Sequence, residues 1–324
     1  MKYGEVPGVG KKISRLVQGT INVRPETSEE TFPLLDRVFE MGCTTYDTAR
    51  GYGGGTNEGA VGEWVNSRGI RDEVVIIGKG AHHSAERQRV TPADITADIE
   101  KGLAEFEFDC IDLYILHRDD PGVPVGPIVE CLNEHKEAGR INAFGGSNWS
   151  HERVAAANEY AAEHELTPFV ASSPNFSLAD QIKEPWDNCV TIAGPKNRAA
   201  RQWYAEHDVA LFTWSSLAGG FFSGRFSRSA EGGGDPEEYF DKLVLDCYCN
   251  DENFTRLERA EELGREKGLN VPQMALAYVV SQPLDIYALI CARRPEEFEE
   301  NMKALETELT PAEIAWLELE SDER

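Results

Sequence analysis

The sequence predicts an α/β fold, a (β/α)8 TIM barrel in a single domain with long loops at the C-terminal face of its strands. Eight short apolar runs alternate with amphipathic segments along almost all of the 324 residues, and this alternation is typical of parallel strands joined by helical crossovers. The runs are almost continuously apolar, as expected of parallel strands covered on both faces. No G-x-G-x-x-G sequence follows the first run, which disfavours an open dinucleotide-binding sheet.

The expected strands and helices follow one another in a regular order. The strands are residues 15–20, 44–49, 73–80, 110–117, 142–148, 169–176, 210–216 and 286–292. The helical patterns are residues 29–42, 58–69, 91–106, 126–139, 152–164 and 295–305. Thr91-Pro92 supplies an N-cap and an N1 proline, and Thr310-Pro311 repeats this signal with Glu313 three positions after the cap.

A single barrel domain is expected over residues 1–324, because neither a tandem repeat nor an interdomain linker is visible. The segment 218–250 contains EGGGDPEE and is too polar and glycine-rich for a core. We expect it to form a long loop after the seventh strand, on the face where barrel active sites lie. Its aromatic residues make it a candidate substrate lid. They are Phe221, Phe222, Phe226, Tyr239 and Phe240.

Composition limits the classes of partner. The net charge of −25 argues against broad contact with nucleic acid or with anionic membranes. The sequence contains no run of about 18 apolar residues, so no membrane span is expected. The first residues, MKYGEVPGVGKK, lack the apolar region of a secretory signal, so none is expected. Seven scattered cysteines indicate free thiols and a cytoplasmic location. The oligomeric state is left open.

Polar side chains stand at the ends of three consecutive expected strands, where barrel strands converge on one face. Asp47 ends the second strand, Lys79 the third and His117 the fourth, and Tyr52 follows Asp47 in a glycine-rich turn. Together these groups can transfer a proton to a carbonyl oxygen. A nearby ammonium favours the phenolate of a tyrosine, whose ordinary pKa is about 10. We therefore expect Tyr52 to donate the proton, with Lys79 tuning it.

The other two groups support that chemistry. Asp47 would hold the ammonium in place, and His117 would hydrogen-bond the carbonyl oxygen and align the substrate. Each residue also has a plain structural reading: Asp47 could cap a helix, and His117 could be a satisfied loop histidine. Four groups that can act together rarely occur by chance at or after successive strand ends, so their combination favours the catalytic interpretation.

With these residues in view, the sequence resembles the aldo-keto reductase superfamily over nearly its whole length. YDTARGYGGGTNEGAVGEWV is similar to that family's second-strand signature, and IIGKG, IDLYILH, GRINAFGGSN and EENMKALE match later motifs in order. The resemblance implies a catalytic tetrad of Asp47, Tyr52, Lys79 and His117. It also implies a reductase that converts an aldehyde or ketone to the alcohol with hydride from a nicotinamide cofactor.

The resemblance further implies a set of cofactor contacts. Ser147 and Asn148 would hydrogen-bond the carboxamide, Trp214 would stack on the nicotinamide, and the WSSLAGGFFSGRF stretch would follow the pyrophosphate. Two family positions differ here, because Ser173 stands where glutamine is common and Ser216 replaces a proline. The full set is Thr20, Asp47, Ser147, Asn148, Ser173, Trp214, Ser215, Ser216, Leu217, Ala218, Gly219, Arg225, Arg293, Glu297, Glu300 and Asn301.

Charges near the C-terminus bear on the choice of cofactor. Arg293 and Arg294 suit a 2′-phosphate, whereas Glu297 would repel it. On this balance NADP(H) is expected in preference to NAD(H).

The substrate class and two rival functions remain open. Arg118, Asp119 and Asp120 form a polar rim beside His117, which favours a sugar-like or polyhydroxylated carbonyl compound, unless these charges cap a helix or pair with one another. Some relatives of the superfamily are potassium-channel β subunits, which bind the cofactor and sense redox state. They generally lack the fourth-strand histidine, so His117 favours an enzyme.

The other rival is a metal-dependent hydrolase. It would need more ligands than His82, His83 and His117 provide, and the pair Cys247 and Cys249 lacks zinc spacing. No metal site is therefore expected.

Overall fold

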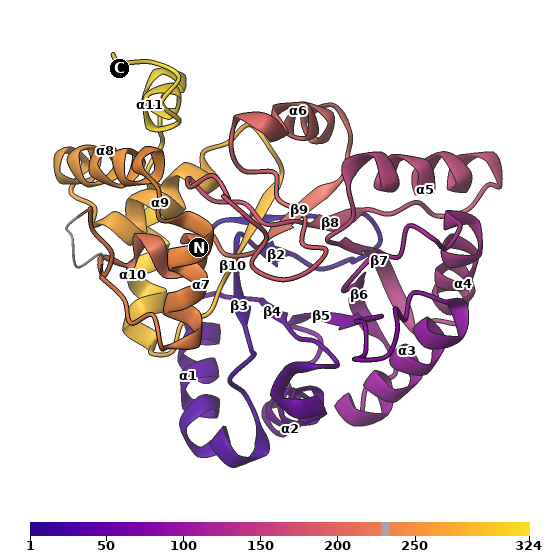
Figure 1. Ribbon diagram of the computed structural model, residues 1–324. Helices are drawn as coiled ribbons and strands as arrows, with labels where there is room; N and C mark the ends of the chain where they lie inside the picture. The colour runs from indigo at the N-terminus through magenta and orange to yellow at the C-terminus, as the bar shows by residue number, and fades with distance from the viewer. Residues whose placement is uncertain (229–232) are drawn as a thin grey trace.

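The structure is a computed structural model, and it describes residues 1–228 and 233–324. Eight parallel strands close into a barrel in the order β10-β3-β4-β5-β6-β7-β8-β9 (Figure 1). They are β3 (Leu16–Gly19), β4 (Thr45–Asp47), β5 (Val75–Gly80), β6 (Ile111–Leu116), β7 (Ile141–Ser147), β8 (Ala171–Ser173), β9 (Ala210–Thr213) and β10 (Ile286–Ile290). The predicted fold class is confirmed, and each expected strand overlaps one of these strands; β7 begins one residue before its expected range.

The barrel interior is filled rather than hollow. Val17, Val75, Ile77, Leu113 and Phe212 are among the strand residues that form one buried cluster inside it. An antiparallel pair, β1 (Tyr3–Gly4) and β2 (Ile13–Ser14), precedes the barrel. The chain between them adds further apolar side chains to the same cluster. This packing closes the N-terminal end of the barrel interior, whereas barrel active sites lie at the opposite end.

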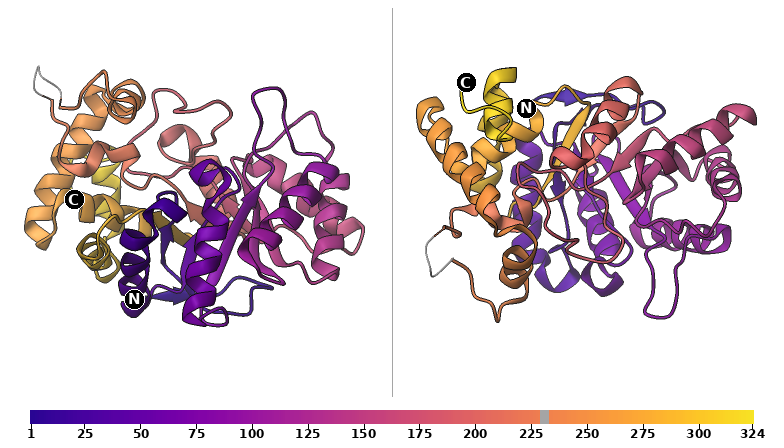
Figure 2. Two further views of the ribbon diagram at one scale, coloured as in Figure 1. Left: turned by 90° about the horizontal axis from the view of Figure 1, so that it is seen from below. Right: turned by 45° about the horizontal axis from the view of Figure 1, so that its top comes forward.

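Helices surround the barrel and cover the outer face of the strands (Figures 1 and 2). They are α1 (Ser28–Glu40), α2 (Asn57–Arg68), α3 (Pro92–Phe106), α4 (Val125–Glu137), α5 (His151–Glu163), α6 (Arg198–Glu206), α7 (Tyr239–Tyr248), α8 (Asp251–Lys267), α9 (Val271–Val280), α10 (Pro295–Glu306) and α11 (Pro311–Leu317). Short 3-10 helices are η1 (Pro25–Thr27), η2 (Tyr52–Gly55), η3 (Pro195–Asn197) and η4 (Ala218–Ser223). The six expected helices are α1 to α5 and α10.

The two expected helix caps are present. The Thr91 side chain accepts a hydrogen bond from the backbone N–H of Asp94 at the start of α3. The Thr310 side chain accepts from the N–H of Glu313, whose carboxylate accepts from the N–H of Thr310. These side chains satisfy backbone donors that the first helical turn leaves without partners.

The segment 218–250 differs from the predicted long loop. It begins with η4 and ends with α7, whose side chains alternate between buried and exposed, and Glu238 caps that helix by accepting from the N–H of Asp241. Phe221, Phe222 and Phe226 are buried in the core that packs the helices against the barrel, because three adjacent large apolar rings lose exposed surface by packing inward. They cannot close over a substrate. The part of the candidate lid at 229–232 lies outside the described residues.

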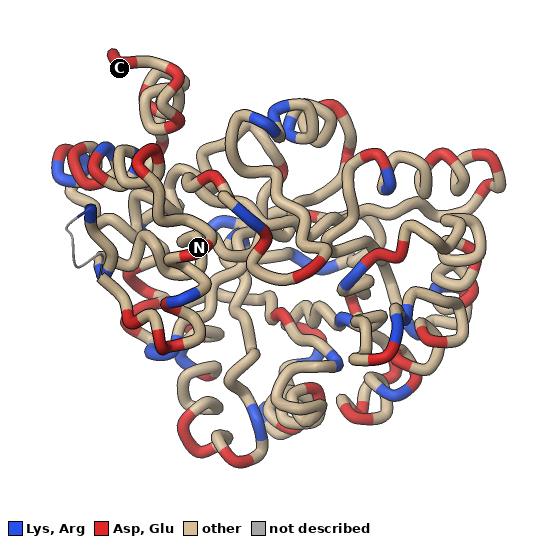
Figure 3. Tube along the Cα trace, in the orientation of Figure 1, with Lys and Arg blue, Asp and Glu red and all other residues tan. Residues whose placement is uncertain are grey.

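The charge of the protein is distributed over its periphery. Acidic positions are spread along the outer helices rather than gathered on one side (Figure 3). Among the described residues, no helix combines the length and the apolar character that crossing a membrane requires.

Candidate active site

A buried ion pair forms the floor of the site. Asp47 is the last residue of β4 and Lys79 lies near the end of β5, two neighbouring strands in which Asp47 stands beside Ile77. The exposed fractions of Asp47 and Lys79 are 4% and 3%, and Lys79 Nζ donates a hydrogen bond to Asp47 Oδ1. Burial raises the pKa of Asp47 and lowers the pKa of Lys79, and in each case the partner's charge opposes the shift.

Tyr52 stands above this pair in the turn that follows β4. Gly53, Gly54 and Gly55 have φ values of 60°, 67° and 95°, a left-handed region that glycine enters without steric cost. The turn brings Lys79 Nζ to 5.3 Å from the centre of the Tyr52 ring. The Tyr52 hydroxyl makes no hydrogen bond within the described chain, and it borders open space described below.

The pKa of Tyr52 moves opposite to the expected direction. Burial raises this pKa well above its usual value, and the carboxylate of Asp47 adds to the rise. The charge of Arg118 opposes the rise, whereas Lys79, which is paired with Asp47, does not offset it. Tyr52 is therefore a neutral phenol at ordinary pH, which is the form of a proton donor.

His117 follows β6 and faces Tyr52. The centres of their rings are 5.9 Å apart in an edge-on arrangement, and the ring of His82 lies 4.9 Å from that of His117. Burial lowers the pKa of His117 well below its ordinary range, and Lys79, His82 and Arg118 lower it further. His117 is thus a neutral imidazole, able to donate one N–H.

Two adjoining cavities meet at Tyr52. The histidine cavity, of about 620 Å³, is bordered by His82, His83, His117, Arg118 and Trp186 together with the ends of β7 and β8. The serine cavity, of about 610 Å³, is bordered by the turn after β9 and the start of α10. Both share Ile21, Tyr52, Trp214, Ser215 and Leu289. A ligand extending from one to the other passes Tyr52.

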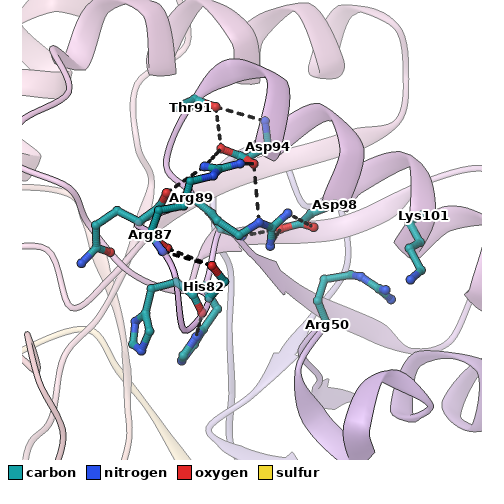
Figure 4. A network of polar contacts seen from close by, with 12 residues as sticks. Arg50, His82, Arg87, Arg89, Thr91, Asp94, Asp98 and Lys101 are labelled. Atoms are coloured by element: carbon teal, nitrogen blue, oxygen red, sulfur yellow. Dashed lines mark hydrogen bonds and ion pairs between the residues drawn. The ribbon is translucent and has the colours of Figure 1, made fainter.

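The loop that carries His82 and His83 is fastened to α3 (Figure 4). Both terminal nitrogens of Arg87 donate to Asp94, at 2.7 and 2.8 Å, and Arg89 Nη2 donates to Asp98 Oδ1 at 2.8 Å. The other oxygen of Asp98 accepts from the N–H of Ala81 at 2.8 Å, directly after β5. These pairs fix the loop that forms one wall of the histidine cavity.

Donors without partners line the serine cavity. The buried Oγ of Ser216 and the buried Nε1 of Trp214 have no hydrogen-bond partner in the part of the chain that is described. The backbone N–H groups of Ser216 and Leu217 donate to no carbonyl there either. Ser215 and Ala218 have φ values of 57° and 52°, and such strain clusters at functional sites. Unpaired donors in a tight turn fit an anionic group such as a pyrophosphate.

The comparisons with known proteins agree with this geometry. The sequence model of the Aldo/keto reductase family matches residues 15–319. The chain belongs to this family. An uncharacterized oxidoreductase, YrpG of Bacillus subtilis (strain 168), is 26% identical, and the alignment covers 95% of this chain and 92% of that protein. The aldo-keto reductase yakc [NADP(+)] of Schizosaccharomyces pombe is 26% identical over 90% of this chain and 82% of its own length.

A solved structure shares the fold. The thermostable aldo-keto reductase Tm1743, crystallised with the inhibitor epalrestat, superposes with a TM-score of 0.74 over 99% of this chain and 100% of its own. The two sequences are 22% identical, so the likeness concerns the barrel architecture.

Most residues that the family resemblance assigned to a cofactor do border the two cavities. Ser147, Asn148, Ser173, Trp214 and Ser215 border the histidine cavity. The serine cavity is bordered by Asp47, Trp214, Ser215, Ser216, Leu217, Gly219, Glu297, Glu300 and Asn301. The Ser147 hydroxyl donates to the carbonyl of Ser173, and Asn148 Nδ2 donates to Ser147 Oγ. Polar groups at the ends of β7 and β8 thus form one connected wall.

Four of the assigned residues lie elsewhere. Thr20 is fully buried and its hydroxyl donates to the carbonyl of Asp47, and Ala218 is fully buried as well. The Arg225 guanidinium donates two hydrogen bonds to Asp241 of α7, at 2.7 and 3.2 Å. Arg293 borders a neighbouring hollow beside β3 and α1 instead. Direct contact with a ligand in the two cavities is thus not available to Thr20 and Ala218.

The polar rim expected beside His117 is assembled only in part. Asp119 is ion-paired with Arg153 of α5 at 3.0 Å, and the Asp120 carboxylate accepts from the N–H of Gly122 at 3.0 Å. Arg118 alone of the three borders the histidine cavity. An opposite charge binds the Asp119 carboxylate and a backbone N–H binds that of Asp120, so for Asp119 the ion pairing that the sequence left open is what the structure has.

Several cavity residues could not be anticipated from the sequence. Pro185, Trp186 and Cys189 come from the connection between β8 and α6, which crosses the mouth of the histidine cavity. Trp186 Nε1 donates to the hydroxyl of Tyr239 at 2.8 Å, which joins this connection to the start of α7. An exposed tryptophan in a polar stretch was the available signal. No group of three His, Cys, Asp or Glu residues that could hold a metal occurs within residues 1–228 and 233–324.

Proposed function

We propose that this protein is an NADP(H)-dependent reductase that converts an aldehyde or ketone to the alcohol, with Tyr52 as the proton donor. Membership of the Aldo/keto reductase family supports an oxidoreductase that acts on carbonyl compounds with a nicotinamide cofactor. The observation that carries the assignment of Tyr52 is its unpartnered hydroxyl at the junction of the two cavities, beside the buried Lys79–Asp47 pair.

The residues fit a nicotinamide dinucleotide laid across both cavities. The unpaired donors of Trp214, Ser216 and Leu217 suit the pyrophosphate end, and the wall of Ser147, Asn148 and Ser173 offers hydrogen-bonding groups to a carboxamide. When bound, the reduced nicotinamide supplies the hydride that no side chain can supply.

Side chains of the protein donate the proton and stabilise the charge that its transfer leaves behind. The phenol of Tyr52 gives its proton to the carbonyl oxygen as negative charge develops there, and the O–H bond of tyrosine is exchanged for the O–H bond of the alcohol. The Lys79 ammonium then stabilises the phenolate left behind, while Asp47 keeps that ammonium in position. Neutral His117 donates a hydrogen bond to the same oxygen, and so fixes which face of the carbonyl is presented.

The preference for NADP(H) rests on charges at the start of α10. Glu297 accepts from Arg294 Nε at 3.1 Å and from the backbone N–H of Arg293 at 2.8 Å. Both its oxygens are thus engaged, whereas the Arg293 guanidinium forms no ion pair in the described chain. A free guanidinium suits a 2′-phosphate, and the name of the relative yakc specifies NADP(+).

Two further parts of the proposal concern location and the rival function. Seven free cysteines suit a reducing cytoplasm. A cofactor-binding redox sensor is the alternative to an enzyme, and the edge-on placement of His117 against Tyr52 favours catalysis over it. The sugar-like substrate class has lost the support of Asp119 and Asp120, whose carboxylates bind elsewhere.

Loss of reduced-cofactor absorbance tests the proposal. Aldehydes, ketones and sugars are offered with NADPH or NADH, and the product is identified as the alcohol by mass spectrometry. We expect turnover with at least one simple aldehyde and a higher kcat/KM for NADPH than for NADH. Tight NADPH binding without turnover across the panel would favour the redox sensor.

A further inference from the structure

Arg118 is a buried cation at the histidine cavity that the proposed reaction does not use. Its exposed fraction is 7%, and it borders the cavity directly after His117. Its Nη1 donates to the carbonyl of His117 at 3.1 Å, while its buried Nε has no partner. Of the five N–H groups of this guanidinium, only one is donated within the described residues.

No carboxylate of the described chain neutralises Arg118. Its neighbour Asp119 is ion-paired with Arg153, and the side chain of Asp120 turns back to its own loop. Asp187 borders the cavity but lies at its exposed rim and forms no ion pair with Arg118. Lys79, the other cation of the cavity, is already paired with Asp47. The histidine cavity therefore carries one positive charge without a counter-ion.

Two further histidines border the same cavity. His83 Nδ1 is buried and has no hydrogen-bond partner among the described residues. His82 and His83 stand on the loop that Arg87 and Arg89 fasten to α3 (Figure 4). A charge removed from water is costly unless an opposite charge and hydrogen bonds compensate it. An anionic group on a bound ligand would supply this compensation.

We propose that the physiological substrate is a carbonyl compound that also carries a carboxylate, and that Arg118 binds this carboxylate. The inference rests on the proposed function, since it places the reacting carbonyl at Tyr52 and His117. A planar guanidinium matches a carboxylate by two parallel hydrogen bonds. A single compensating charge also suits a carboxylate better than a phosphate monoester, which carries about −1.5 to −2. Arg118 selects the substrate and takes no part in proton transfer.

Matched substrates test the inference directly. The value of kcat/KM is measured with NADPH for 4-formylbenzoate, for its methyl ester and for 4-formylphenyl phosphate, in the unaltered protein and in Arg118→Gln, Arg118→Lys and Arg37→Gln. We expect the acid to be favoured over the ester by about tenfold or more, the scale of a hydrogen bond to a charged group. The ratio should approach one in Arg118→Gln and be partly kept in Arg118→Lys. Arg37, on the exposed outer face of α1, serves as the matched control and should leave the ratio unchanged.

A binding experiment separates the proposed function from the proposed carboxylate site. The fluorescence of Trp186 and Trp214 reports the binding of benzoate and, for comparison, of benzamide. If neutral aldehydes turn over and the acid has no advantage, the inference is overturned and the proposed function stands. A preference for the phosphate over the carboxylate also overturns it. If no carbonyl turns over, the proposed function fails, and benzoate binding alone then tests the carboxylate site. Weaker benzoate binding in Arg118→Gln would support that site. Benzoate binding that is unchanged in Arg118→Gln would overturn it.

Discussion

At the scale of single residues, burial decides the charge state of the ionisable groups in the site. It keeps two of them neutral and leaves two others as an ion pair. Tyr52 and His117 border open space yet hold no charge at ordinary pH, because burial raises the pKa of the first and lowers the pKa of the second. Lys79 and Asp47 are less exposed than Tyr52 and His117, and they form a hydrogen-bonded ion pair. A neutral phenol and a neutral imidazole thus stand together beside one paired cation.

The neutrality of His117 can be measured. Its pKa lies well below the ordinary range because of burial and the nearby Lys79, His82 and Arg118. Protonation should therefore occur only at acid pH, and the neutral form should persist as the pH falls from 8 through 6. Carbon-13 NMR of labelled histidine should show a His117 signal that does not titrate in this window. A signal that titrates between pH 6 and 8 and disappears in His117→Gln would contradict this.

The Lys79–Asp47 pair predicts an asymmetric stability effect. Asp47→Asn leaves a buried ammonium without a counter-ion and should lower the free energy of unfolding by about 3–5 kcal/mol. The double change Asp47→Asn with Lys79→Met removes that charge and should recover part of the loss. Urea unfolding measures both. Asp246→Asn, which removes only exposed pairs with lysines, is the control and should change little; equal losses in the single and double variants would argue against the pair.

Residues at strand ends could be found from the sequence, but their surroundings could not. Asp47, Lys79 and His117 stand at fixed places relative to apolar runs, so their convergence follows from the barrel alone. The direction of the Tyr52 pKa shift depends on how deeply the ring is buried and on the nearby carboxylate of Asp47. Asp119 does not pair with Arg118 but with Arg153, which lies on α5, 34 positions after Asp119.

At the scale of elements, the order of strands was predictable and several helices were not. α9, with the sequence VPQMALAYVV, is buried on nearly all sides and shows no amphipathic period. α7 was hidden by the polar, glycine-rich residues before it. The caps of α3 and α11 were visible because a threonine followed by proline acts within one turn. Local chemistry is readable in the sequence, whereas burial by distant elements is not.

The start of α10 carries a prediction about the cofactor. Arg293→Gln removes the unpaired guanidinium and should lower kcat/KM for NADPH by about tenfold, with little effect on NADH, since a charged hydrogen bond has that scale. Glu297→Gln removes a carboxylate and should shift the preference further toward NADPH. Steady-state kinetics with both cofactors measures these changes. A loss that is equal for NADPH and NADH in Arg293→Gln would place this residue outside phosphate recognition.

At the scale of the whole molecule, a buried acid links barrel packing to pH. Glu58 on α2 is 2% exposed, accepts a hydrogen bond from Arg50 and packs against Gly102 of α3. Burial raises the pKa of Glu58 to about 7, against the opposing charge of Arg50. The folded protein thus holds this proton more tightly than the unfolded chain, so the contribution of Glu58 to stability is present below about pH 4.5 and is lost as the pH rises to about 7.

Glu58→Gln isolates this contribution. The shift in the pKa of Glu58 corresponds to about 3 kcal/mol of pH-dependent stability. The glutamine variant does not titrate at this position and so cannot lose that contribution. Urea unfolding at pH 4.5, 5.5 and 7 should therefore show the unaltered protein losing stability more steeply than Glu58→Gln. Parallel stability curves for the two proteins would show that Glu58 does not titrate in this range.

The central claim is that Tyr52 is the proton donor of a carbonyl reductase, and Tyr52→Phe tests it most directly. This change removes one oxygen atom that forms no hydrogen bond with any described residue, so the fold and the cofactor cavities should be preserved. The measurement is kcat with the best aldehyde alongside the Kd for NADPH in the same preparation. We predict that kcat falls by at least about 100-fold, the lower range for general acid catalysis, while the Kd for NADPH changes little. Turnover that survives in Tyr52→Phe with NADPH still bound would contradict the claim.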